Sequence, residues 1–196
     1  MLPLAACSRG KKHTALPAGS RVLALGDSLT FGYGAERSQS YPSVLAQLTG
    51  WQVENGGVSG DTSAQALARL PALMRTQPKL VLVCIGGNDF LRGLPEQDTR
   101  RHIGKMIETV QAGGAEVVLA AVPHLTTGAL LGFPSDHTLY RDLAEQYAVP
   151  LLSDAWAEIL GNKDLKSDAI HANAAGYRVF AEKMAAFLKK QGFQAA

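Results

Sequence analysis

The sequence holds few of the features that mark several other functional classes. Its 196 residues include only two cysteines, Cys7 and Cys84, and no paired C-x-x-C spacing, so a structural zinc site has no support. The formal net charge is +2, and no basic stripe with interleaved aromatic residues occurs, which argues against a nucleic-acid partner. Walker, dinucleotide-binding and H-E-x-x-H motifs are absent as well. These absences weaken nucleotide, nucleic-acid and metal-based interpretations.

The composition that is present suits one folded domain. Apolar residues make up 46% of the chain and charged residues 18%, so enough apolar surface is available for a core. The length fits a single domain of ordinary size, which we place at residues 20–196. Cys84 lies inside the apolar run 80–85, and we expect it to be a small buried hydrophobic residue.

Residues 1–19 have the character of a polar tether ahead of that domain. The segment Leu4-Ala5-Ala6-Cys7 resembles the lipobox of bacterial lipoproteins, in which the cysteine is lipidated. Only Met1-Leu2-Pro3 precede it, so a chance match is the alternative. We favour a protein of the cell envelope or periplasm, attached to a membrane through Cys7, over a cytoplasmic one. No other segment is long and apolar enough to span a membrane.

Apolar runs alternate with segments of helical periodicity along the chain. Five strands are expected, at residues 22–25, 51–54, 79–85, 116–122 and 150–152. Helices are expected to begin at 41–42, at 62–63 and at 98–99, and to occupy 136–147 and 173–190. This alternation predicts right-handed crossovers and a parallel sheet covered on both faces. The predicted fold class is α/β, a three-layer α/β/α sandwich with a five-stranded parallel sheet.

Four polar clusters begin where apolar runs stop. They are Gly26 to Leu29, Asn55 to Thr62, Gly86 to Asp89 and Asp168 to His171. Parallel strands point their carboxyl ends toward one rim of a sheet, where open α/β proteins place their active sites. We therefore expect the first three clusters to gather there, with the loop before the last helix bringing the fourth to the same edge.

Ser28, His171 and Asp168 are the residue types that acyl transfer needs. A serine hydroxyl is a poor nucleophile until a neighbouring base takes its proton, and a ring nitrogen of His171 can do so. Asp168 can accept a hydrogen bond from the other ring nitrogen, which fixes the tautomer and stabilises the imidazolium. The sequence therefore predicts Ser28, Asp168 and His171 as catalytic residues, with acid and base on one loop.

The tetrahedral intermediate of such a reaction carries a negative oxygen that needs hydrogen-bond donors already in place. We expect an oxyanion hole made of the backbone N–H groups of Ser28 and Gly60 and the side-chain amide of Asn88. A glycine at position 60 keeps any side chain from obstructing the substrate's approach to the backbone amide.

Each cluster taken alone also has a structural explanation. Gly26-Asp27-Ser28 is compatible with an ordinary strand-to-helix turn, and Gly86 to Asp89 with a turn that holds a left-handed asparagine. Asp168 and His171 alone are compatible with a solvated loop pair. Their joint occurrence, in this order and at strand ends, favours the catalytic interpretation.

Two further aspartates and two further histidines accompany these clusters. Asp27 and Asp89 are expected to anchor their loops and not to react. His124 and His137, which flank a long loop, are the alternatives to His171 as the base. Neither of them follows a carboxylate by three residues.

The four clusters together resemble the sequence blocks of the SGNH, or GDSL, hydrolase family. Gly26-Asp27-Ser28-Leu29 is similar to the first block, and Asn55 to Thr62 to the second. Gly87-Asn88-Asp89 is similar to the third block, and Asp168 to His171 to the last. The resemblance covers most of the chain after residue 20, and it implies a flavodoxin-like fold. The G-x-S-x-G elbow of ordinary α/β-hydrolases is absent.

Within that family, the chain is most similar to the bacterial thioesterase, arylesterase and lysophospholipase type. This similarity rests on Gly60-Asp61-Thr62-Ser63 and on Ala68-Arg69-Leu70-Pro71. It implies hydrolysis of esters and thioesters without a metal or another cofactor. The expected partner is a small-molecule ester or thioester, and the chain is expected to act as a monomer. A carbohydrate O-acetylesterase of the envelope and a non-catalytic flavodoxin-like binding domain are the competing interpretations.

The connection 123–135 is the main departure from the family pattern, because His124 to Ser135 match none of its blocks. Its apolar residues include Leu125, Leu130 and Phe133. Loops of this length usually have a function, so we expect these three side chains to line a groove for an acyl chain. A hydrophobic flap packed on the core is the alternative.

Overall fold

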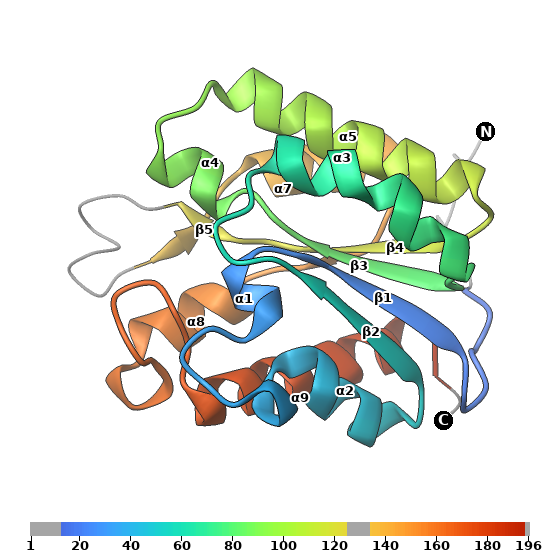
Figure 1. The fold of residues 1–196 in the computed structure, drawn as a ribbon, viewed down its shortest axis with the longest axis horizontal. Helices are drawn as coiled ribbons and strands as arrows, with labels where there is room; N and C mark the ends of the chain where they lie inside the picture. Colours follow the sequence, from blue (N-terminus) through green and yellow to red (C-terminus); the bar gives the residue numbers. More distant parts are fainter. Residues whose placement is uncertain (1–12, 125–133, 195–196) are drawn as a thin grey trace, which may run out of the picture.

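The computed structural model describes residues 13–124 and 134–194, and Figure 1 shows how they fold. Five strands form one sheet in the order β2-β1-β3-β4-β7, and every neighbouring pair is parallel. In that order they span Gln52–Gly57, Arg21–Gly26, Leu80–Cys84, Glu116–Ala120 and Leu151–Leu152. The predicted five-stranded parallel sheet is confirmed. A separate antiparallel pair joins β5 (Pro123–His124) to β6 (Ser135–Asp136).

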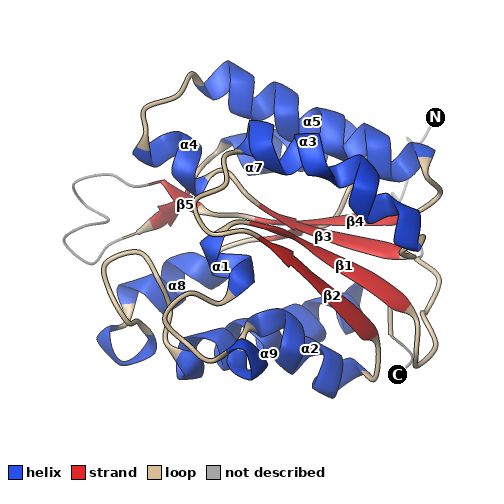
Figure 2. Cartoon of the chain, in the orientation of Figure 1, coloured by secondary structure: helices blue, strands red, loops and turns tan. Residues whose placement is uncertain are grey.

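Helices cover both faces of the sheet, as the α/β/α prediction requires (Figure 2). One face carries α3 (Ser63–Leu73), α5 (Glu96–Ala112) and α7 (Leu139–Tyr147). The other face carries α2 (Tyr41–Thr49), α8 (Ala155–Gly161) and α9 (Ala174–Gln191). Two short helices, α1 (Ser28–Phe31) and α4 (Gly87–Leu91), follow β1 and β3. Short 3-10 helices span Arg37–Gln39, Met74–Thr76 and Lys163–Leu165.

The strand order explains why the polar clusters converge. The chain passes from β1 to its neighbour β2 and then crosses back to β3 on the other side of β1. Connections leave β1 and β3 in opposite directions at such a switch point, which opens a crevice outside the carboxyl ends of the strands. The strands β1, β2 and β3 all end at this edge, so the connections that follow them begin there (Figure 1).

Several element boundaries differ from those predicted. β2 continues to Gly57, α5 begins at Glu96, and α7 begins only at Leu139 because Ser135–Asp136 pairs with β5. The helices α1, α4 and α8 were not expected. The first two have only four and five residues, too few for a hydrophobic period to reveal them.

The core lies on both faces of the central strand. All five residues of β3 are buried, which is why this segment is apolar without alternation. On the face covered by α8 and α9, the ring of Trp156 stacks on Phe180 with centroids 3.9 Å apart, and its N–H group donates to Cys84 Sγ at 3.2 Å. Cys84 is fully buried, as predicted.

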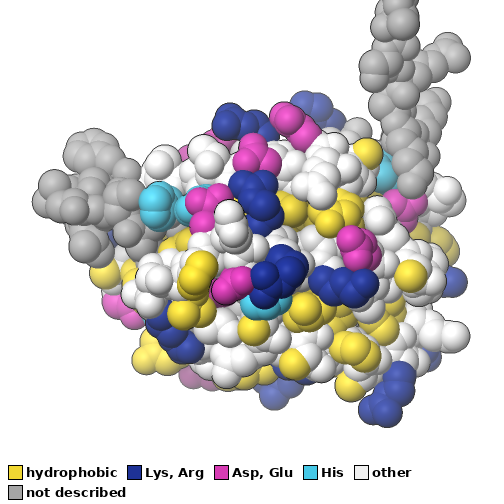
Figure 3. All heavy atoms as spheres, turned by 90° about the horizontal axis from the view of Figure 1, so that it is seen from above, with side chains coloured by type: hydrophobic (Ala, Val, Ile, Leu, Met, Phe, Trp, Pro, Cys, Tyr) yellow, Lys and Arg dark blue, Asp and Glu magenta, His cyan; other side chains and the backbone are white. Residues whose placement is uncertain are grey.

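The surface shown in Figure 3 mixes charges of both signs with scattered apolar side chains. No helix in the described ranges is long and apolar enough to cross a membrane. The lipobox-like segment Leu4-Ala5-Ala6-Cys7 lies outside the described residues, and so do Leu125, Leu130 and Phe133.

Candidate active site

Ser28 stands at the carboxyl end of β1, where the chain turns into α1. Asp27 is the N-cap of this helix, and its Oδ1 accepts the N–H group of Leu29 at 3.0 Å. A side-chain acceptor at this position satisfies an N–H group that the helix itself leaves unpaired. The contact fixes the turn and holds the Ser28 side chain at the edge of the sheet. Asp27 therefore has the contacts of a loop anchor.

His171 reaches Ser28 from the loop before α9, although the two residues lie 143 positions apart in the sequence. Its Nε2 is 2.9 Å from Ser28 Oγ, and its Nδ1 is 2.8 Å from Asp168 Oδ2. The other carboxylate oxygen of Asp168 accepts the backbone N–H groups of Ile170 and His171 at 2.9 and 2.8 Å. One turn therefore fixes the carboxylate and the ring together.

These contacts determine where the protons lie. Burial alone would raise the pKa of Asp168, but the hydrogen bonds from His171 and from the Ile170 N–H group outweigh it and lower this pKa below its usual value. An ionised carboxylate only accepts, so Nδ1 of His171 carries a proton and donates it to Asp168. In the neutral ring, Nε2 is then the acceptor for the Ser28 hydroxyl.

The predicted oxyanion donors lie in the same pocket as Ser28 and His171. Ser28, Gly60 and Asn88 all line it, from the loops after β1, β2 and β3. Nδ2 of Asn88 donates to the carbonyl oxygen of Asp61 at 2.9 Å, which uses one of the two amide hydrogens and leaves the second for a ligand. Gly60 has φ +86°, so the backbone conformation itself favours glycine at this position.

Arg69 of α3 links the end of β1 to the loop after β2. Its Nε donates to Asp61 Oδ2 at 2.7 Å, and its Nη2 donates to the carbonyl oxygen of Gly26 at 2.8 Å. Asp61 in turn holds Asn88 through its backbone oxygen. One guanidinium therefore links the strand end that precedes Ser28 to the loop that carries Gly60. In the sequence, Arg69 stands out only as part of the family-like segment 68–71, and nothing there indicates its contacts with Asp61 and Gly26.

A second, buried cluster holds α4 against α3 and α5. Asp89 accepts the backbone N–H and the hydroxyl of Ser63, at 2.8 and 2.5 Å, and the hydroxyl of Thr99 at 3.2 Å. Nδ1 of His102 lies 2.9 Å from the Ser63 hydroxyl oxygen. Because the Ser63 proton is donated to Asp89, His102 must donate its own Nδ1 proton to Ser63. Asp89 therefore anchors its loop, as the sequence analysis expected.

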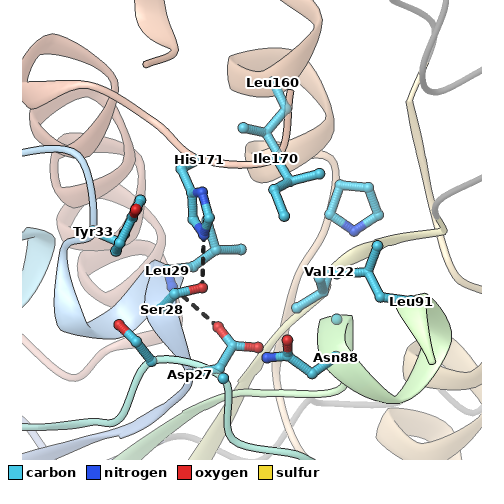
Figure 4. Close-up of a pocket in the computed structure, with 14 residues that line it drawn as sticks. Asp27, Ser28, Leu29, Tyr33, Asn88, Leu91, Val122, Leu160, Ile170 and His171 are labelled. Atoms are coloured by element: carbon cyan, nitrogen blue, oxygen red, sulfur yellow. Dashed lines mark hydrogen bonds between the residues drawn. The ribbon is translucent and has the colours of Figure 1, made fainter. Parts of the chain in front are cut away.

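The pocket around Ser28 has a volume of about 370 Å³ (Figure 4). Side chains that sequence reasoning did not assign to the site complete its wall; they are Leu29, Tyr33, Leu91, Val122, Pro123, Leu160 and Ile170. The ring of Tyr33 lies against that of His171, with centroids 4.5 Å apart. Leu29 and Ile170 are adjacent in sequence to the predicted Ser28 and His171, and Leu91 follows Asn88 by three residues, which is the signal that could have indicated them.

His124 and His137, the alternatives to His171, belong to another cluster. Their rings lie 4.5 Å apart, and His137 stacks on Phe90 with centroids 4.3 Å apart. Burial, with a further contribution from His124, lowers the pKa of His137. In the part of the chain that the structure describes, neither ring forms a hydrogen bond with Ser28. Within the same ranges, no group of three or more His, Cys, Asp or Glu side chains is placed to hold a metal ion.

A hydroxyl, an imidazole and a carboxylate in line at the rim of a parallel α/β/α sheet define the class of serine hydrolases. The chain belongs to the GDSL-like lipase/acylhydrolase family, whose model matches residues 24–179. It is 37% identical to the thioesterase 1/protease 1/lysophospholipase L1 of Escherichia coli (strain K12), over 86% of this chain and 83% of that protein.

Two further comparisons agree with this membership. An arylesterase of Vibrio mimicus is 33% identical, over 88% of this chain and 90% of its own length. Among solved structures, the crystal structure of TesA superposes with a TM-score of 0.78 at 28% identity, covering 88% of this chain and 99% of that one. The predicted family and fold are therefore confirmed.

Proposed function

We propose that the protein is a serine esterase that hydrolyses carboxylic esters and thioesters through an acyl-enzyme on Ser28. The observation that carries this proposal is the 2.9 Å contact between Ser28 Oγ and His171 Nε2, backed by the 2.8 Å contact from the same ring to Asp168. The hydroxyl has an acceptor for its proton, and the ring has an acceptor that stabilises its charge once it is protonated.

In the first half of the reaction, Ser28 Oγ attacks the acyl carbon while its proton passes to His171 Nε2. The carbonyl oxygen becomes an oxyanion, which the N–H groups of Ser28 and Gly60 and the amide of Asn88 receive. When the tetrahedral intermediate collapses, the bond to the leaving oxygen or sulfur breaks and His171 returns the proton to that atom. The acyl group stays on Ser28 as an ester.

In the second half, water replaces the leaving group in the pocket. His171 takes a proton from the water, the hydroxide attacks the acyl carbon, and a second oxyanion forms in the same place. Collapse of this intermediate releases the carboxylic acid and returns the proton to Ser28 Oγ. Asp168 keeps the tautomer of the ring correct throughout both halves and stays ionised.

The pocket supports acyl groups with an apolar chain as substrates. Its wall beside Ser28 includes Leu29, Val122, Leu160 and Ile170, and its volume of about 370 Å³ has room for such a chain. The names of the relatives, a thioesterase and lysophospholipase on one hand and an arylesterase on the other, point to the same ester and thioester chemistry.

A panel of aryl esters, acyl-CoA, lysophospholipid and acetylated sugar tests the proposal with purified protein. We expect turnover of the first three classes and stoichiometric labelling of Ser28 by a fluorophosphonate probe, located by peptide mass spectrometry. Turnover confined to acetylated sugars would instead indicate the carbohydrate esterase. Absence of both labelling and turnover would refute the assignment of Ser28.

We also propose that the protein acts as a monomer in the cell envelope, held through a lipid on Cys7. The support is the segment Leu4-Ala5-Ala6-Cys7 and the polar residues 8–12 that follow it. The predicted tether does not extend to residue 19, because the His13 ring stacks on Phe193 and Leu16 packs against the core. Intact-mass analysis of the protein from its native membranes should show an N-terminal lipid, and Cys7→Ser should release the protein into the soluble fraction. An unlipidated N-terminus in the native protein would contradict this proposal.

A further inference from the structure

Exposed apolar side chains are concentrated around the mouth of the pocket. Among the described residues, six large hydrophobic side chains are exposed to solvent. Tyr33 and Leu91 line the pocket, and Val58 is next to its lining residue Ser59. Phe31 ends the helix that Ser28 begins, Leu94 follows Leu91 by three residues, and Leu48 belongs to α2. The other five are between 41% and 51% exposed, and we call them the apolar rim: Phe31, Tyr33, Val58, Leu91 and Leu94. Exposed apolar groups gathered at one place mark an interaction site more often than scattered ones do.

Local contacts place the rim on both sides of Ser28. Tyr33 and Leu91 line the pocket, and Figure 4 shows them to either side of the Ser28 side chain. On the side of α1, the backbone of Phe31 packs closely on Gly57, the residue before Val58 at the end of β2. The approach is so close that a Cβ atom added to Gly57 would lie 2.2 Å from the backbone nitrogen of Phe31. Members of the rim therefore flank the pocket on both sides of the nucleophile.

A cation stands within this rim. Arg92 is exposed and follows Leu91, and its Nη2 donates to the carbonyl oxygen of Gly60 at 2.8 Å. This contact holds the guanidinium beside the pocket mouth. Arg69, Arg100 and Arg101 pair with carboxylates, whereas in the described ranges Arg92 makes no ion pair. Its charge is thus available to an anionic partner.

We propose that the apolar rim and Arg92 dock the protein on anionic lipid surfaces, so that acyl substrates enter the pocket directly from a lipid aggregate. The inference deepens the proposed esterase function and rests on it for the identity of the substrate. Apolar side chains insert into the interface of such an aggregate, and a nearby cation attracts its phosphate groups. The apolar pocket wall continues the rim inward, so an acyl chain can pass to Ser28 without crossing water.

Sedimentation with vesicles tests the docking, using the full chain with Cys7→Ser so that no attached lipid contributes. Protein should bind phosphatidylglycerol vesicles more tightly than phosphatidylcholine vesicles, and added salt should reduce the difference. The double variant Val58→Ser/Leu94→Ser should lower the vesicle affinity about tenfold, because two exposed apolar side chains are lost. Arg92→Gln should remove the preference for anionic lipid.

Leu48→Ser is the matched control, since Leu48 is 45% exposed but belongs to α2. It should leave vesicle binding unchanged. No vesicle binding by the parent protein, or an equal loss in Leu48→Ser and in the double variant, would overturn the proposal. So would a rim-dependent dimer in size-exclusion chromatography, because the rim would then serve a second copy of the chain.

A soluble ester separates this inference from the proposed function. Val58 and Leu94 do not line the pocket, so the double variant should hydrolyse monomeric p-nitrophenyl acetate at the parent rate while losing rate on vesicle-borne lysophospholipid. Failure of the parent on p-nitrophenyl acetate would count against the esterase assignment and leave the vesicle result to be judged by itself. Equal loss on both substrates would contradict docking.

Discussion

The described part of the molecule contains two sets of serine, histidine and aspartate in contact, and only one of them has the order of contacts that hydrolysis needs. At the carboxyl edge of the sheet, His171 stands between Ser28 and Asp168, with contacts of 2.9 and 2.8 Å. In the interior, Ser63 stands between His102 and Asp89, with contacts of 2.9 and 2.5 Å. The residue types are the same, and the order of contact differs.

That order decides the direction in which protons can move. The Ser28 hydroxyl faces a ring nitrogen that is free to accept, so the serine oxygen can gain nucleophilic character. The Ser63 hydroxyl has already donated its proton to Asp89, and His102 donates to the serine. Ser63 is also fully buried, so no substrate can reach it. The inner set therefore fixes α3, α4 and α5 together, and the outer set is available for chemistry.

The largest expected effect comes from exchanging each serine for alanine. Ser28→Ala should lower kcat by roughly 10⁴- to 10⁶-fold, because the nucleophile is lost while binding and oxyanion donors remain. Ser63→Ala should keep most of kcat but lower the free energy of unfolding by about 1–3 kcal/mol, because buried Asp89 loses a donor. Kinetics on p-nitrophenyl esters and urea denaturation measure the two effects. A larger loss of kcat in Ser63→Ala than in Ser28→Ala would reverse the roles of the two sets.

Asp168→Asn should have the next largest effect. The asparagine oxygen can still accept the backbone N–H groups of Ile170 and His171, so the loop should keep its shape. Its NH2 group would face Nδ1 of His171 and favour the tautomer with the proton on Nε2, which cannot take the proton of Ser28. We expect kcat to fall on the order of 10⁴-fold with little change in stability. Near-parent turnover in this variant would show that Asp168 does not set the tautomer.

The fold was largely predictable because its three central strands, β1, β3 and β4, are short apolar runs buried on both faces. Leu80–Cys84 is wholly apolar and lies at the centre of the sheet, so pattern and burial agree. Strand order was not predictable in the same way, because it depends on which side of β1 each crossover packs. The short helix α4 escaped detection since Asn88 and Asp89 are placed by contacts with Asp61 and Ser63, far away in sequence.

The proposed catalytic groups were more predictable than the groups that support them. Ser28, His171 and Asp168 stand in recognisable local contexts, and the structure brings them together. The inner cluster and Arg69 act through partners from separate elements, and their residue types are common on any helix. The side chains of the pocket wall come from five or more loops and helices, and only tertiary packing brings Leu160 near Ile170.

Arg69→Ala tests whether the contacts of Arg69 with Asp61 and with the Gly26 carbonyl oxygen affect catalysis. Its loss removes the contacts to Asp61 and to the Gly26 carbonyl, so the oxyanion donors and the nucleophile should no longer be held in register. A displacement of about 1 Å can lower kcat on the order of 100-fold, and we expect KM to change little. Arg69→Lys should recover part of kcat, and exposed Arg75→Ala is the control. An unchanged kcat with reduced stability would assign Arg69 a purely structural role.

The smallest expected effect is a pH dependence of stability that comes from Asp27. This aspartate is buried, whereas Asp168 lies at the edge of the sheet, and the pKa values of the two shift in opposite directions. Asp168 at the rim has a lowered pKa, whereas burial, opposed by the Leu29 N–H group and reinforced by Asp89 and Asp61, raises the pKa of Asp27 to about 7. Between the usual aspartate pKa and about 7, folded protein keeps a proton on Asp27 that unfolded protein has lost. The free energy of unfolding should therefore fall as pH rises through this window and level off above it.

Asp27→Asn removes this titration and keeps an oxygen to accept the Leu29 N–H group. The stability of the variant relative to the parent should therefore rise between pH 5 and pH 7, with a limiting slope of about 1.4 kcal/mol per pH unit. Urea denaturation at several pH values measures the difference, with Asp164→Asn, at an exposed position, as the matched surface control. A constant difference for Asp27→Asn would mean that Asp27 ionises as readily as a surface carboxyl. Asp27 would then be a charged N-cap of α1 between pH 5 and pH 7.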